Sequence, residues 1–83
     1  MVDNSDKVFL LKKILVESNN PELILSSAIK KLFVKHTGKT SGFYDFTIWL
    51  EVFDFLLPVK GKTYRKTFKP NYKKIDSYAE QNN

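Results

Sequence analysis

The residues best suited to chemistry lie in a basic, aromatic-rich stretch near the C-terminus. Between Pro58 and Lys74 the chain has seven basic residues and no acidic one, with tyrosine and phenylalanine interspersed. Such a segment can neutralise phosphates while its rings stack on bases. The sequence therefore predicts contact with the phosphate backbone of DNA or RNA through segment 58–74. The residues expected to make these contacts are Lys60, Lys62, Tyr64, Arg65, Lys66, Phe68, Lys69, Tyr72, Lys73 and Lys74.

The positive charge of the chain belongs to this one segment. The whole chain has a net charge of +5, from 14 basic and nine acidic residues. Because seven of the basic residues lie in 58–74, the remainder has seven basic and nine acidic residues, a net charge of −2. Lys30, Lys31 and Lys35 would extend the basic surface if the segment folds beside them. Arginine, the usual reader of guanine, occurs once, so we expect no base-specific recognition.

A second candidate is the tetrapeptide Thr-Gly-Lys-Thr at 37–40, which matches the end of the phosphate-binding motif G-x-x-x-x-G-K-[ST]. The first glycine of that motif would stand at position 33, which is Phe33. The preceding residues also have a helical pattern, whereas the motif follows a strand. We therefore interpret the tetrapeptide as a turn between helices, with Gly38 ending the first of them.

The remaining candidates are the single histidine, His36, and the carboxylates Asp45, Glu51 and Asp54. A general base needs a substrate proton within reach, and a zinc site needs three or four ligands. The chain has no cysteine and no such set around His36. Glu51 and Asp54 would share the solvent side of a helix. We therefore expect no catalysis, no metal site and no cofactor.

An apolar stretch from Ser41 to Pro58 must position these candidates. As a helix, it places five large apolar side chains on one face: Phe43, Phe46, Leu50, Phe53 and Leu57. As a strand, apolar and polar residues alternate until the pattern fails at 53–55. Some fifteen residues are long for a strand. We therefore predict a helix over 43–57, begun by Thr40 or Ser41 and stopped by Pro58, with a strand as the alternative.

Two amphipathic helices precede this stretch. The first follows the possible N-cap residues Asp3 to Ser5 and buries an apolar face. Asn19 suits a left-handed helix end, Asn20 an N-cap and Pro21 the first position of a second helix, which runs to about residue 36. So short a connection predicts an αα-hairpin.

The sequence thus predicts a mostly α, three-helix domain, made of the αα-hairpin and an aromatic-rich central helix, with a basic C-terminal extension. The alternative is an α+β domain with a β-hairpin formed by 43–56 and 62–69. At 83 residues we expect a single domain over 1–83, with frayed tails at 1–4 and 79–83. Beyond the central helix, Ile75 and Tyr78 are expected to anchor one helical turn.

A different class of partner follows from the flanks of the central helix. Tyr44, Ile48 and Phe55 lie beside its main apolar face, so they need either the C-terminal segment or another protein to cover them. The alternative function is therefore a small protein-binding regulator or inhibitor, of the kind that mobile elements encode, acting on an acidic protein surface. A homodimer is possible. We expect no membrane span, a cytoplasmic location and no small-molecule substrate.

Overall fold

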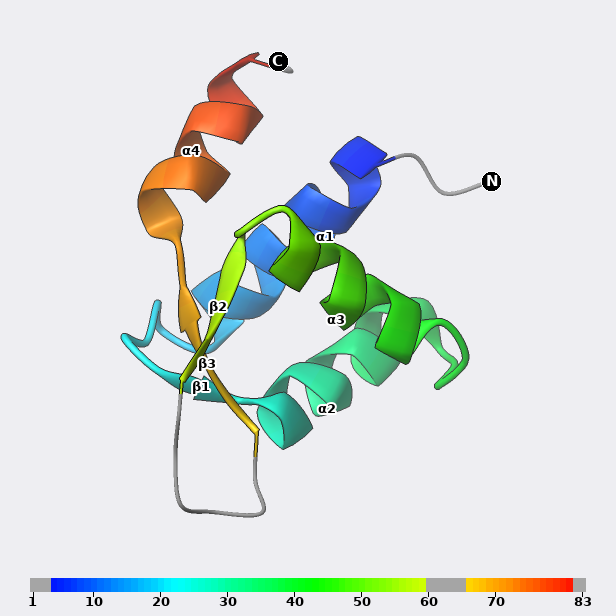
Figure 1. Cartoon of the computed structure of the whole chain (residues 1–83). Coiled ribbons are helices and arrows are strands. Elements are labelled where there is room, and N and C mark those ends of the chain that lie inside the picture. Colours follow the sequence, from blue (N-terminus) through cyan, green and yellow to red (C-terminus); the bar gives the residue numbers. More distant parts are fainter. Residues whose placement is uncertain (1–3, 60–65, 82–83) are drawn as a thin grey trace.

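The computed structural model describes residues 4–59 and 66–81, which form four helices and a three-stranded sheet (Figure 1). In chain order the elements are α1 (Asn4–Glu17), β1 (Ile24–Leu25), α2 (Ser26–Thr37), α3 (Phe43–Val52), β2 (Leu56–Val59), β3 (Thr67–Pro70) and α4 (Tyr72–Gln81). The first three helices pack against one another, the sheet closes one side, and α4 packs on α1. The predicted mostly α class is confirmed, but the three-helix arrangement with an extension is wrong, because the C-terminal part forms two strands and a fourth helix.

The sheet has the order β1-β3-β2, and both pairings are antiparallel. The strand β3 lies in the centre, with Ile24 opposite Phe68 on one side and Leu57 opposite Lys69 on the other. Pro58 has no N–H to donate, which suits the edge strand β2. The alternative hairpin of 43–56 with 62–69 is also wrong, since residues 43–52 are helical and the observed hairpin pairs 56–59 with 67–70.

The central helix ends five residues earlier than predicted. Asp54 adopts a left-handed conformation, with φ of 62°. The N–H of Phe55 then donates to the carbonyl of Leu50 at 2.8 Å, and that of Asp54 donates to Glu51 at 3.1 Å. These two bonds form a Schellman motif, which satisfies the last carbonyls of the helix and turns the chain into β2. The predicted N-cap is wrong too, because Gly42, with φ of 87°, precedes the helix.

The second helix begins at Ser26 rather than at Pro21. Asn19 is left-handed as predicted, with φ of 63°, but Asn20 is left-handed as well, with φ of 49°, and so cannot act as an N-cap. The N–H of Asn20 instead donates to the carbonyl of Leu15 at 2.8 Å and closes the end of α1. The chain then runs extended into β1, so α1 and α2 are not joined as a direct αα-hairpin.

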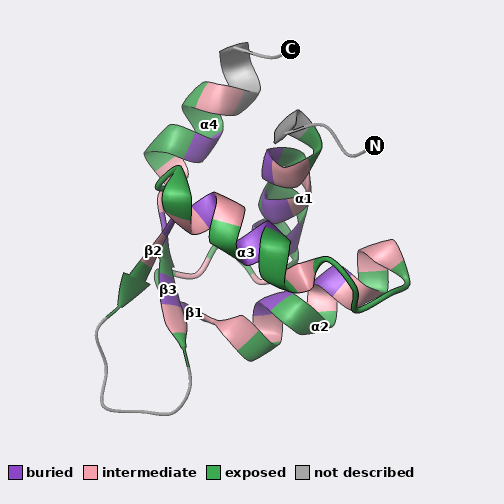
Figure 2. Ribbon diagram, turned by 45° about the vertical axis from the view of Figure 1, so that its right-hand side comes forward, coloured by how far each residue is buried: buried purple, intermediate pink, exposed green. Residues whose placement is uncertain are grey.

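The core lies between the helices and the inner face of the sheet (Figure 2). Its buried apolar residues are Val8, Leu11, Ile14, Leu15, Ile24, Ile29, Phe33, Phe46, Leu50, Phe55, Leu56, Phe68 and Ile75. The C-terminal helix joins this core through Ile75 and is longer than the single turn predicted. Its N-cap is Asn71, whose side-chain oxygen accepts from the N–H of Lys74 at 3.3 Å. No helix among the described residues is both long and apolar enough to cross a bilayer.

Candidate functional site

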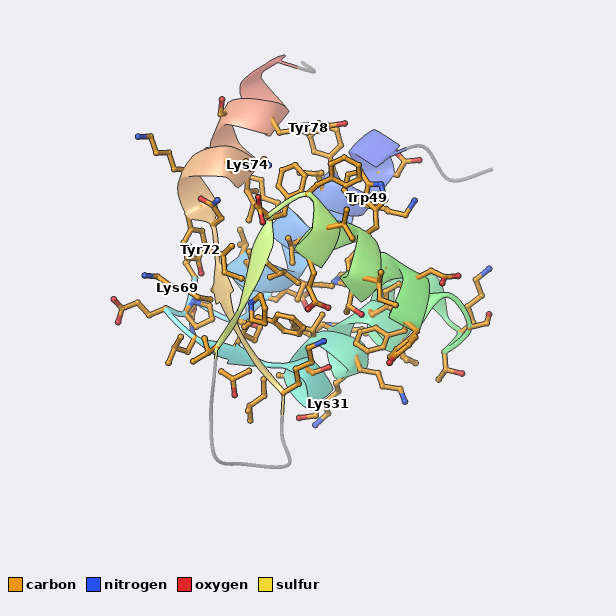
Figure 3. The ribbon with its side chains drawn as sticks, in the orientation of Figure 1. Lys31, Trp49, Lys69, Tyr72, Lys74 and Tyr78 are labelled. Atoms are coloured by element: carbon orange, nitrogen blue, oxygen red, sulfur yellow. The ribbon has the colours of Figure 1, made fainter. Side chains whose placement is uncertain are left out.

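The candidate site is the edge where the β2–β3 hairpin meets the start of α2. Leu25 pairs with Thr67, and the N–H of Ser26 donates to the carbonyl of Lys66 at 2.8 Å. Lys66 therefore lies beside the first turn of α2, and Lys30 and Lys31 follow in the second turn. Figure 3 shows Lys31 on α2 near the start of β3.

Lys35 continues this row of cations along α2. It follows Lys31 by four residues, so the two share a side of the helix. All four side chains belong to exposed residues. We call Lys30, Lys31, Lys35 and Lys66 the basic edge. The sequence predicted that the lysines of α2 would extend the basic surface if the C-terminal segment folded beside them. Part of that segment does lie beside α2.

Two cations of the basic edge are held by acidic partners. The ammonium of Lys66 lies 3.0 Å from a carboxylate oxygen of Glu51 and 5.2 Å from the ring centroid of Phe68. The ammonium of Lys35 lies 3.2 Å from Glu17. Both lysine side chains remain more than half exposed. Exposed pairs of this kind are worth about 0 to 1 kcal/mol, so either lysine can exchange its carboxylate for a phosphate at small cost.

Glu17 has a second neighbour at the end of α2. The Nε2 atom of His36 lies 3.3 Å from Glu17, and the histidine side chain is 20% exposed. The hydrogen bond from Lys35 is the main reason that the pKa of Glu17 lies below its usual value of 4.5. Within the ranges 4–59 and 66–81, no group of three or more His, Cys, Asp or Glu residues could hold a metal ion.

Two of the aromatic residues expected to stack on bases have other surroundings. Phe68 belongs to β3, and its side chain is fully buried in the core. The hydroxyl of Tyr72 donates to the carbonyl of Pro21, and burial raises the pKa of this phenol. In this conformation Phe68 offers no ring face to a ligand, and Tyr72 joins the start of α4 to the loop before β1.

The other lysines of the C-terminal segment point away from the basic edge or contact the protein itself. Lys69 is exposed on the central strand, while Lys73 and Lys74 lie on α4 beyond the sheet (Figure 3). The ammonium of Lys74 donates to the carbonyl of Phe53 and lies 5.0 Å from the ring centroid of Phe55. It thus stabilises the C-terminal end of α3. The fold therefore divides the predicted basic segment between two ends of the molecule.

Four of the predicted contact residues, Lys60, Lys62, Tyr64 and Arg65, lie outside the described residues. In the sequence they stand between the end of β2 at Val59 and the start of β3 at Thr67. Their contacts with nucleic acid stay a prediction.

Helix α3 carries an exposed apolar surface that the basic pattern does not include. Tyr44, Ile48 and Val52 are 75%, 43% and 67% exposed and are spaced four residues apart, so they form one row, here called the α3 stripe. Exposed positions recur along α3 in Figure 2. Of the flank residues named from the sequence, Tyr44 and Ile48 stay exposed, whereas Phe55 is buried and its ring meets that of Tyr78 on α4 at 5.5 Å.

Charge also distinguishes α3 from the basic edge. Residues 43–52 include Asp45 and Glu51 but no basic residue. Among the described residues, the side-chain carboxylate of Asp45 makes no hydrogen bond or ion pair. The sequence signal for this surface was the apolar content on both sides of the central helix, which exceeds what one buried face can use.

Comparisons of the chain with protein-family models, with curated proteins and with solved structures found no match.

Proposed function

We propose that this chain is a non-catalytic binding protein with the architecture of a winged helix-turn-helix, which contacts the phosphate backbone of DNA or RNA through its basic edge. The order helix, strand, helix, helix, strand, strand, helix, with the sheet order β1-β3-β2, supports this architecture. The helices α2 and α3 are joined by a short turn over 38–42 that contains two glycines, as in helix-turn-helix units. The hairpin β2–β3 would be the wing.

The observation that carries the proposal is the pairing of β3 with the segment that leads into α2. This pairing sets Lys66, which directly precedes β3, next to the turns of α2 that carry Lys30 and Lys31, although about 35 residues separate them in the chain. A row of cations on neighbouring elements can contact successive phosphates of one backbone. With four phosphate contacts, one for each lysine of the basic edge, counterion release lowers the affinity roughly 10²-fold between 50 and 200 mM salt.

The surface of α3 argues against reading of base sequence by this helix. The residues that a helix-turn-helix would present to the major groove are Tyr44, Asp45 and Ile48. Recognition of bases commonly uses Arg, Lys, Asn or Gln as bidentate donors, and α3 has none of them. A carboxylate near the phosphates would also be repelled. We therefore expect binding that depends on salt and depends little on sequence.

A charge-reversal experiment tests this function. The double variant Lys30→Glu, Lys31→Glu should weaken binding to a 20-bp duplex at about 50 mM salt by at least tenfold. The slope of log affinity against log salt concentration should also become shallower, by the amount that about two phosphate contacts contribute. The control is Lys13→Glu, Lys73→Glu, which makes the same change in net charge on α1 and α4. Fluorescence anisotropy measures both, with single-stranded DNA and RNA titrated in parallel. Equal losses in the two variants would contradict a localised site.

A second candidate function rests on the α3 stripe. Exposed aromatic and aliphatic side chains in one row are typical anchors of protein interfaces. The protein would then act by blocking or bridging a partner protein. If the native protein fails to bind any nucleic acid at about 50 mM salt, the protein-binding function remains. Light scattering then compares the molecular mass of the Ile48→Glu variant with that of the native chain. A lower mass for the variant would show that the α3 stripe joins two copies.

A further inference from the structure

A groove of about 460 Å³ lies between α1, the end of α2 and the start of α3. Its floor is apolar, formed by Leu10, Phe33 and Phe46, and two lysines, Lys7 and Lys39, line its rim. The volume falls in the range of pockets that take small molecules. We propose that this groove binds a small anion with an apolar body, such as a medium-chain carboxylate. This site goes beyond the proposed function and does not depend on it.

The floor of the groove is held rigidly by aromatic packing. The rings of Phe33 and Phe46 lie 5.1 Å apart between centroids, and both side chains are buried. On its other side the ring of Phe33 meets that of Phe43 edge to face at 5.4 Å. A pocket floor fixed in this way exists before the ligand arrives, so binding needs little reorganisation.

The charge at the rim favours an anion. Lys39 is exposed, and no described residue forms an ion pair with its ammonium. Lys7 lies with its ammonium 5.4 Å from the centroid of Trp49, an interaction that leaves the cation free to receive a carboxylate. Asp6 also lines the groove and brings a negative charge, so the rim carries two positive charges against one. A ligand with an apolar chain on the floor and a carboxylate between the lysines satisfies both features.

A second cavity, of about 300 Å³ between α1 and α4, lacks this combination. Its lysine, Lys12, lies 3.7 Å from Asp76, which also lines the cavity. The two charges balance each other, so this cavity has no excess charge with which to select a ligand.

The turn between α2 and α3 links the groove to the helix pair. Ser41 and Gly42 line the groove, and the hydroxyl of Thr37 donates to the carbonyl of Phe33 and lies 3.0 Å from that of Lys39. A bound anion would therefore contact α1, α2 and the turn together. We expect it to stabilise the folded chain by an amount that grows with the logarithm of its concentration above the dissociation constant.

The test is a titration of the native protein with octanoate, followed by ¹H-¹⁵N correlation spectra. We expect a dissociation constant of about 1 mM or below, given ten non-hydrogen atoms, with shifts of the amides of Lys39, Ser41 and Gly42. Octylammonium, with the same chain and the opposite charge, should bind at least about tenfold more weakly, and butyrate should do so as well.

Matched variants distinguish the effect of the two rim lysines from the effect of net charge. Lys7→Gln, Lys39→Gln should weaken octanoate binding about tenfold, whereas Lys12→Gln, Lys13→Gln, which removes the same charge elsewhere on α1, should leave it within about twofold. The spectra report at the same time whether each variant is folded. Failure of octanoate to bind at 20 mM, equal binding of octylammonium, or equal loss in both variants would overturn the proposal. Nucleic-acid affinity, measured separately, is independent of each of these results.

Discussion

The basic edge and the α3 stripe are two surfaces of one small domain that differ in almost every physical respect. The basic edge combines Lys30, Lys31 and Lys35 of α2 with Lys66, the residue before β3. The α3 stripe exposes Tyr44, Ile48 and Val52 beside a carboxylate. Helix α3, which would be the reading helix in the proposed helix-turn-helix architecture, has no Arg, Lys, Asn or Gln with which to read bases. Under the proposed function, the basic edge would attract nucleic acid, and the α3 stripe would be left for a protein partner.

The largest effect should come from Phe68, which the sequence assigned to the binding surface and the fold places in the core. Phe68→Ala should lower the free energy of unfolding by about 3 to 5 kcal/mol, because it removes a fully buried ring. Denaturant titration measures this loss. The control, Tyr44→Ala on the α3 stripe, should change stability by no more than about 0.5 kcal/mol. A stable Phe68→Ala protein that loses nucleic-acid binding would reverse this assignment.

A smaller effect should follow when Lys66 is released from its partner. Glu51→Gln removes the carboxylate 3.0 Å from the Lys66 ammonium, so binding no longer has to break that pair. We expect the affinity for a duplex at about 50 mM salt to rise about two- to fivefold. The matched control is Asp76→Asn, which releases Lys12 on the α1 and α4 side and makes the same change in charge. If both variants bind equally well, Lys66 has no special place in the site.

The smallest effect concerns Glu17, the partner of Lys35. The hydrogen bond from Lys35 is the main cause of the lowered pKa of Glu17 in the folded chain. The ionised carboxylate therefore stabilises the fold at any pH above the usual pKa of 4.5. This stabilisation is lost as the pH falls through the lower pKa of the folded chain. The Glu17→Gln variant should therefore melt slightly below the native chain at pH 7, and the difference should shrink as the pH falls below 4.5. Thermal unfolding across this range measures the difference, and a constant gap at every pH would contradict it.

Much of the helical part of the fold could be predicted from the sequence because it depends on local patterns. The apolar spacing of α1 and α2 and the left-handed Gly38 are readable in the chain itself. The end of α3 was not readable, since a left-handed conformation is uncommon for a residue such as Asp54, and the ring contact of Phe55 with Tyr78 on α4 joins residues distant in the chain. The strand β1 is two residues long and exists because β3 pairs with it, which no local pattern indicates.

The candidate site was predictable in charge but not in geometry. The count of cations in 58–74 pointed to the hairpin, and Lys30 and Lys31 were recognised as a possible extension. Which aromatic rings face inward depends on the register of β3, where Phe68 opposes Ile24 and Pro58. A shift of one residue would exchange the two faces of the strand, so composition alone cannot assign them.

The measurement that tests the account most directly is a map of amide shifts when a 16-bp duplex is added to the ¹⁵N-labelled native protein. We predict the largest shifts at residues 26–31 and 66–69, with small changes over 44–52, and a loss of these shifts as salt rises. Shifts concentrated along the α3 stripe, or an absence of any shift at about 50 mM salt, would contradict the proposal that the basic edge is the nucleic-acid site.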